Sequence, residues 1–107
     1  MAGKKYNVIV ARRADVMLLA HTGFLARVSV SAARELLVEF KKATVLLEDN
    51  PYQFPFADKT DVPDIPLRTY RKCLFFGRYK ALYLVEEKYV FIDVIIDCRQ
   101  ENKYLYG

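Results

Sequence analysis

The sequence has few of the residues that usually mark a metal, redox or acid–base site. Only two cysteines occur in the chain, Cys73 and Cys98, and neither belongs to a CxxC pair or a Cys/His spacing. We therefore expect reduced core thiols rather than zinc or redox chemistry. His21 is the single histidine, and its place in a predicted helix, far along the chain from the basic residues, indicates an ordinary helix residue. No cofactor and no metal site are predicted.

Long apolar runs are also missing. None approaches the length of a membrane-spanning helix, and the N-terminal residues lack the apolar core of a signal peptide, so we expect a cytoplasmic protein with no membrane segment. Hydrophobic residues make up 53% and charged residues 28% of the sequence, which argues against disorder. A chain of 107 residues fits one domain, covering residues 1–107.

Acidic residues are absent from one long stretch of an otherwise mixed sequence. Between Ile65 and Val85 there is no aspartate or glutamate, and the net charge of the whole chain is +4. Such a concentration of positive charge attracts polyanions. Nucleic acid, an anionic membrane surface and an acidic protein are all compatible with this composition. The basic residues of the stretch are Arg68, Arg71, Lys72, Arg78 and Lys80.

The first half of the chain predicts one strand and two helices. Residues 5–11 alternate in the way a strand with one buried face does. A helix follows from Arg12, with an apolar stripe expected along Met17, Leu18, Ala20, Phe24, Leu25 and Val28. Ser29 or Ser31 can cap a second helix, and Pro51 ends it because proline cannot continue the hydrogen-bond ladder.

The second half predicts a loop and three strands. Residues 51–67 hold all four prolines and show no period, so we expect one long ordered loop. Residues 70–76, 79–85 and 89–97 have strand composition and are joined by short turns at 77–78 and 86–88, which makes them antiparallel. The fold class is therefore α+β, with two helices on one face of a small twisted, mainly antiparallel, four-stranded sheet in the order β-α-α-β-β-β.

Strand periodicity groups the charged side chains by face. Arg71 shares a side with Cys73 on its strand, and Arg78 shares a side with Lys80 on the next. Asp93, Asp97 and Arg99 likewise share one parity on the last strand. If these three groups point to the same face of the sheet, the exposed face presents Arg71, Lys80 and Arg99 as a cationic site for phosphates. Asp93 and Asp97 resemble a carboxylate dyad, but without further ligands nearby they are more suited to offset Arg99 or Lys80 than to bind a metal.

The chain resembles the RelE/ParE family of toxins from type II toxin–antitoxin systems, once grouped with plasmid-stabilisation proteins. The resemblance covers residues 6–104 and rests on the order of elements, on YRKCLFFGRYKALYLV, and on IIDCRQENKYLY near the end of the chain. It implies the same small sheet with two helices. It also implies a cognate antitoxin that wraps the toxin and covers its basic groove. Family members act either by cleaving mRNA in the ribosomal A site or by poisoning DNA gyrase.

The resemblance also suggests which residues form the site. Lys80 and Arg99 match basic residues that hold the scissile phosphate in the ribonuclease branch, where fixed cations stabilise developing charge. In a gapless alignment with the family, Tyr104 lies one residue away from the position of a tyrosine that some members stack on a base. Cys73 replaces a lysine of that branch, and a C-terminal histidine is missing, so the proton-transfer group is not evident. Arg71 matches a further basic position, and we add Arg71, Lys72 and Arg78 as nucleic-acid-binding residues.

Three functions follow as hypotheses. The first is a metal-independent endoribonuclease that inhibits translation by ribosome-dependent mRNA cleavage and leaves a 2′,3′-cyclic phosphate. The second is a gyrase poison without nuclease activity, which the missing acid–base groups favour. The third is a degenerate member that retains only antitoxin binding. The expected partners are a cognate antitoxin together with the ribosome and mRNA, or DNA gyrase in the second case.

Overall fold

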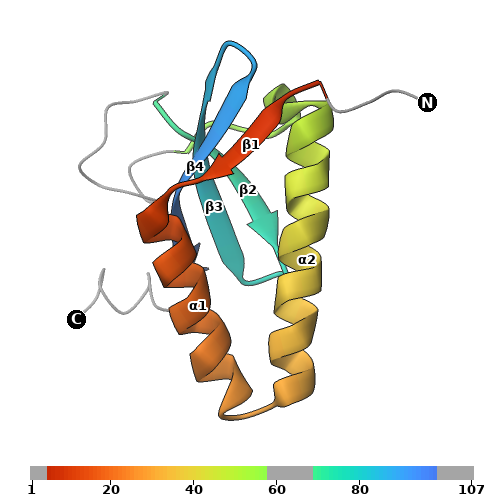
Figure 1. Ribbon diagram of the computed structural model, residues 1–107, viewed down its shortest axis with the longest axis vertical. Coiled ribbons are helices and arrows are strands. Elements are labelled where there is room, and N and C mark those ends of the chain that lie inside the picture. Colours follow the sequence, from red (N-terminus) through yellow and green to blue (C-terminus); the bar gives the residue numbers. More distant parts are fainter. Residues whose placement is uncertain (1–4, 58–68, 99–107) are drawn as a thin grey trace.

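A computed structural model describes residues 5–57 and 69–98 of the chain as two helices packed against a four-stranded sheet (Figure 1). The predicted order of elements is confirmed. No helix in these two ranges is both long enough and apolar enough to cross a membrane. The elements are β1 (Asn7–Val10), α1 (Arg12–Ala26), α2 (Val30–Asp49), a short 3₁₀ helix η1 (Pro51–Gln53), β2 (Arg71–Phe75), β3 (Tyr79–Glu86) and β4 (Tyr89–Asp97).

The strands lie in the order β1-β4-β3-β2. The last three form the predicted antiparallel meander. The first strand pairs with the last, and this pair is parallel, with Asn7 opposite Tyr89 and Val10 opposite Ile92. The sheet is therefore mixed, because α1 and α2 carry the chain away from β1 before the meander begins.

Local sequence signals account for the ends of α2. The Ser29 side chain accepts a hydrogen bond from the Ala32 amide (3.1 Å), which satisfies one of the unpaired donors of the first turn. The helix ends at Asp49, and Pro51 opens η1. The predicted cap and stop of this helix are therefore confirmed. Its buried apolar residues are Ala33, Leu36, Ala43 and Leu47.

The apolar stripe of α1 differs from the prediction. Its buried residues are Ala14, Leu18 and Leu25, whereas Phe24 and Val28 are more than half exposed. Leu18 and Leu25 are seven residues apart and lie on one helix face, and Ala14 extends that face by a turn. The predicted stripe is too wide here, since the helix buries only the side turned to the sheet.

Both helices cover the same face of the sheet (Figure 1). Alternate residues of each strand point into this helix-covered face and form the core with the helices. The opposite side is called the outer face below. The strand residues of the core are Cys73 and Phe75 in β2, Tyr79, Ala81 and Tyr83 in β3, and Val90, Ile92 and Ile95 in β4.

The free edge of β2 is covered by residues 55–57. The Ala57 amide donates to the Tyr70 carbonyl (2.7 Å) and the Lys72 amide donates to the Pro55 carbonyl (2.9 Å). Phe56 forms a bridge with Arg71. The predicted loop at 51–67 thus pairs with β2 through one isolated bridge, while residues 58–67 lie outside the described ranges.

The turn between β2 and β3 centres one residue earlier than predicted. Phe76 and Gly77 have φ angles of 57° and 62°, and the Arg78 amide donates to the Phe75 carbonyl (3.3 Å). Positive φ at both central positions is the geometry whose twist matches a two-residue hairpin. Gly77 adopts it without strain, whereas Phe76 does so at a cost.

Candidate nucleic-acid interface

Lys72 and Lys80 lie together on the outer face. Lys72 is opposite Leu82, and Leu74 is opposite Lys80, so the two lysines are diagonal neighbours on adjacent antiparallel strands. Residues that are paired directly across two strands point to the same side of the sheet. The Cα atoms of diagonal neighbours are about 7–8 Å apart. Both side chains are partly exposed. The structure thus brings Lys80, from the predicted cationic site, together with Lys72, a predicted nucleic-acid-binding residue that was not assigned to that site.

Arg71 does not belong to this site. It is opposite Tyr83, a core residue, and therefore points to the helix-covered face. Its Nη1 donates to the Phe54 carbonyl (2.6 Å), and its guanidinium lies 4.1 Å from the centre of the Phe56 ring. The expectation that Arg71 and Lys80 share the exposed face is wrong, because the two residues have opposite strand parity across the hairpin.

Arg78 also points elsewhere. Its Nη2 donates to Asp97 Oδ2 (2.9 Å) and its Nε to both carboxylate oxygens (3.2 Å each). These hydrogen bonds, together with the charge of Asp97, raise the pKa of the Arg78 guanidinium despite its burial. Asp97 is paired with Tyr79 in the sheet, on the helix-covered face. Arg78 therefore does not share the side of Lys80, and this predicted nucleic-acid contact forms an internal ion pair instead.

A bulge in β4 places Asp93 at the centre of a second polar cluster. Leu82 is opposite Val94 and Tyr83 is opposite Ile92, so Asp93 is the extra residue. Arg13 donates from Nη2 to Asp93 Oδ2 (2.7 Å) and from Nε to Oδ1 (3.1 Å). The bulge changes the parity of the strand, which is why Asp93 and Asp97 do not form the dyad that their spacing suggests.

Tyr70 reaches the same carboxylate from the other side of β3. Its hydroxyl donates to Asp93 Oδ2 at 2.5 Å. Burial alone would raise the pKa of Asp93, but the hydrogen bonds from Tyr70 and Arg13, with the Arg13 charge, outweigh it and lower the pKa below its ordinary value. The hydrogen bond to Asp93, burial and the carboxylate charge raise the pKa of Tyr70. At neutral pH the pair is therefore a carboxylate and a neutral phenol.

His21 lies close to the strands, although it is distant from them in sequence. Its Nε2 is 3.4 Å from the Ile95 carbonyl, and its ring centre is 5.0 Å from that of Tyr79. It is partly buried, as expected for an ordinary helix residue. Tyr79 and Lys80 are neighbours and point to opposite faces, so His21 and Lys80 are separated by the sheet.

Of the remaining predicted positions the structure describes only Cys73. Arg99 and Tyr104 lie outside the described residues. Cys73 is buried in the core, and this burial raises the pKa of its thiol to about 11. The thiol is therefore protonated at neutral pH and is not a nucleophile. Within residues 5–57 and 69–98, no group of three or more His, Cys, Asp or Glu side chains could hold a metal ion.

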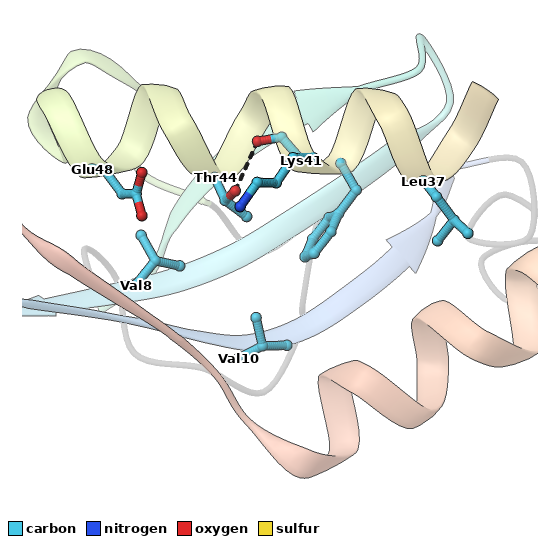
Figure 2. Close-up of a pocket in the computed structure, with 7 residues that line it drawn as sticks. Val8, Val10, Leu37, Lys41, Thr44 and Glu48 are labelled. Atoms are coloured by element: carbon cyan, nitrogen blue, oxygen red, sulfur yellow. Dashed lines mark hydrogen bonds between the residues drawn. The ribbon is translucent and has the colours of Figure 1, made fainter. Parts of the chain in front are cut away.

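A pocket of about 380 Å³ lies on the other side of the molecule, between β1 and α2 (Figure 2). Val8 and Val10 extend into it from β1, and Leu37 from α2, with Lys41 and Glu48 at the polar positions. Thr44 donates to the Lys41 carbonyl (2.7 Å) and so satisfies its own hydroxyl. This apolar groove is separate from the lysine pair, because it belongs to the helix-covered face.

Comparison with known proteins finds no match: no protein-family model fits the chain, and no curated protein sequence resembles it significantly. The geometry of the site, rather than a relative, therefore has to carry the functional argument.

Proposed function

We propose that the protein is a toxin of the RelE/ParE type that inhibits translation by cleaving mRNA in the ribosomal A site. The observation that supports this most directly is the position of Lys72 and Lys80 as diagonal neighbours on the outer face. Two lysines in diagonal positions on one face of a sheet can flank a single phosphate and stabilise the charge that develops on it during attack by the 2′-hydroxyl. Arg99 and Tyr104 remain part of the proposal as a third cation and a base-stacking ring.

The antitoxin partner is supported by exposed apolar surface near the groove. Leu37 on α2, which lines the groove, is 43% exposed, and Val8 and Val10 extend into the groove from the edge strand β1. Together they offer an apolar strip beside the free edge of the sheet. We propose that a segment of the cognate antitoxin occupies this strip, which would leave control of toxicity to a protein partner that binds away from the lysines.

The gyrase alternative also has an observation in its favour. Arg71 and Arg78, two of the predicted nucleic-acid contacts, are committed to contacts within the protein. Fewer cations are then available for RNA on the outer face than the sequence suggested. A toxin that acts by protein–protein contact would not need them.

The test is cell-free translation with purified protein, followed by primer extension on the mRNA with and without ribosomes. The proposal expects ribosome-dependent cuts at A-site codons, and a large loss of cleavage in Lys72→Ala and Lys80→Ala. Lys42→Ala is the matched control, because Lys42 is an exposed α2 lysine paired with Glu39. This variant should cleave mRNA at the wild-type rate. Intact mRNA in every reaction would overturn the proposal, and a gyrase supercoiling assay would then test the alternative.

A further inference from the structure

The sequence offers no evident proton-transfer group for RNA cleavage, but the outer face contains one candidate. Tyr70 directly precedes β2, and its carbonyl takes part in the pairing with residues 55–57, so the extended backbone includes Tyr70, which shares a face with Lys72 two residues on. The hydrogen bond from Tyr70 across β3 to Asp93 on β4 agrees with this placement, since the helix-covered side of β3 is filled there by the Tyr83 ring. The lysine pair and the Tyr70–Asp93 pair are therefore neighbours on one surface.

We infer that Tyr70 and Asp93 act as a relay that accepts the proton of the attacking 2′-hydroxyl at a phosphate held by Lys72 and Lys80. The inference rests on the proposed function and adds the group that this function otherwise lacks. Tyr70 touches the substrate, and Asp93 is the final acceptor.

The 2′-hydroxyl gives its proton to the Tyr70 oxygen while the Tyr70 proton passes along its hydrogen bond to the Asp93 carboxylate. The 2′-oxygen forms its bond to phosphorus, and the bond from phosphorus to the 5′-oxygen breaks. The departing 5′-oxygen takes a proton from water, and Asp93 later returns its proton to solvent. The products are a 2′,3′-cyclic phosphate and a 5′-hydroxyl.

The protonation states at neutral pH agree with this direction of transfer. The Asp93 carboxylate is ionised because its pKa is lowered, and the raised pKa of Tyr70 keeps the phenol protonated. Tyr70 therefore has a proton to give, and the Asp93 carboxylate can accept one. The Asp93 side chain is 25% exposed, so the relay lies near the surface that RNA would contact. Arg13 is a positioning residue, since its two hydrogen bonds fix the orientation of the carboxylate.

The test compares single-turnover mRNA cleavage on ribosomes by the wild type and by Tyr70→Phe, with toxin in excess. We expect the rate of cleavage to fall about 100-fold or more, in line with general acid–base catalysis, while the toxin concentration for half-maximal rate stays the same. The wild-type rate should be nearly constant between about pH 6.5 and 8.5, where neither relay group changes its protonation state. The variant rate should rise with hydroxide concentration, because hydroxide can replace the relay.

Tyr83→Phe is the matched control. It removes a phenol hydroxyl from the same sheet, one that donates to the Pro51 carbonyl on the helix-covered face, and it should cleave at the wild-type rate. Asp93→Asn is the second variant, and it should show the same loss and the same new pH dependence even if Tyr70→Phe folds poorly. Urea unfolding shows which variants are folded.

The outcomes separate the two proposals. If the wild type cleaves and both relay variants cleave equally fast, the relay is overturned and the proposed function stands. If the wild type leaves mRNA intact on ribosomes, the proposed function fails and the relay fails with it. A lower rate without the new pH dependence would also overturn the relay, because it would indicate a structural role for Tyr70.

Discussion

Arg78, directly before β3, and Asp97, at the end of β4, form an ion pair in which the Arg78 side chain is 18% exposed and the Asp97 side chain only 2%. The pair joins the two strands where the sheet ends. A carboxylate this deeply buried depends on its partner, because the loss of one member leaves the other charged and desolvated.

Breaking this ion pair should destabilise the protein. We expect Arg78→Ala to lower the free energy of unfolding by about 3 kcal/mol, the lower end of the range for breaking a buried pair, since Arg78 keeps some contact with solvent. Urea unfolding measures the change. Lys42→Ala breaks an exposed pair with Glu39 and should change stability little. Equal effects of the two substitutions would show that burial does not matter for this pair.

Arg71 should affect stability rather than RNA binding. Arg71→Gln loses the hydrogen bond to Phe54 and the contact with the Phe56 ring. Because both contacts hold residues 51–57 against β2, we expect a lower unfolding midpoint and faster proteolysis of that segment. Affinity for an RNA oligonucleotide should stay at the wild-type value, whereas Lys80→Ala should weaken it. Weaker RNA binding by folded Arg71→Gln would place Arg71 in the interface after all.

In the second half of the chain, the bounds of the strands were predicted more accurately than the faces of the sheet to which their side chains point. The strands at 70–76, 79–85 and 89–97 agree with β2, β3 and β4 to within one residue, because turns and strand composition are local signals. The face of the sheet to which each charged side chain points is not set by the local sequence. One extra residue, Asp93, changes the parity of β4, and nothing in its own sequence surroundings indicates a bulge.

Contacts between distant segments were also beyond the sequence. Arg13 and Asp93 are 80 positions apart, and Tyr70 and Asp93 are 23 apart. The contact of Arg13 with Asp93 depends on the parallel pairing of β1 with β4, which places the start of α1 beside the bulge, whereas Tyr70 reaches Asp93 across β3. The proton-transfer candidate was therefore missed, and Lys80 was expected beside Arg71, whereas it shares its face with Lys72.

The hydroxyl of Tyr83 should contribute to stability through one contact. It donates to the Pro51 carbonyl at 2.6 Å, and both residues are buried. Tyr83→Phe leaves that carbonyl without this donor, so we expect a loss of about 1–2 kcal/mol in the free energy of unfolding. Tyr89→Phe, at a 43% exposed position, serves as the control and should be close to neutral in the same urea titration.

The Asp93 cluster should make stability depend on pH in the acidic range. The pKa of Asp93 is lowered in the folded protein. As the pH falls, Asp93 therefore takes up a proton at a higher pH in the unfolded chain than in the folded protein. The contribution of Asp93 is complete well above its ordinary pKa of 3.8 and is lost as the pH falls through that value and the lower folded one.

The measurement compares the unfolding free energies of the wild type and Asp93→Asn across this range. We expect their difference to be constant above about pH 5 and to shrink below pH 4. A difference that stays constant down to pH 3 would contradict a lowered pKa of Asp93, and with it the hydrogen bonds from Tyr70 and Arg13 as its cause.

The parallel pairing of β1 with β4 has a consequence for synthesis of the protein. During synthesis β1 can find its partner only after Tyr89–Ile92 has been made. Until then β1 has no neighbouring strand, and the helices lack part of the surface they cover. Pairing between such distant segments is slow to form. A nascent chain of this protein therefore cannot assemble the complete outer face before β4 has been translated.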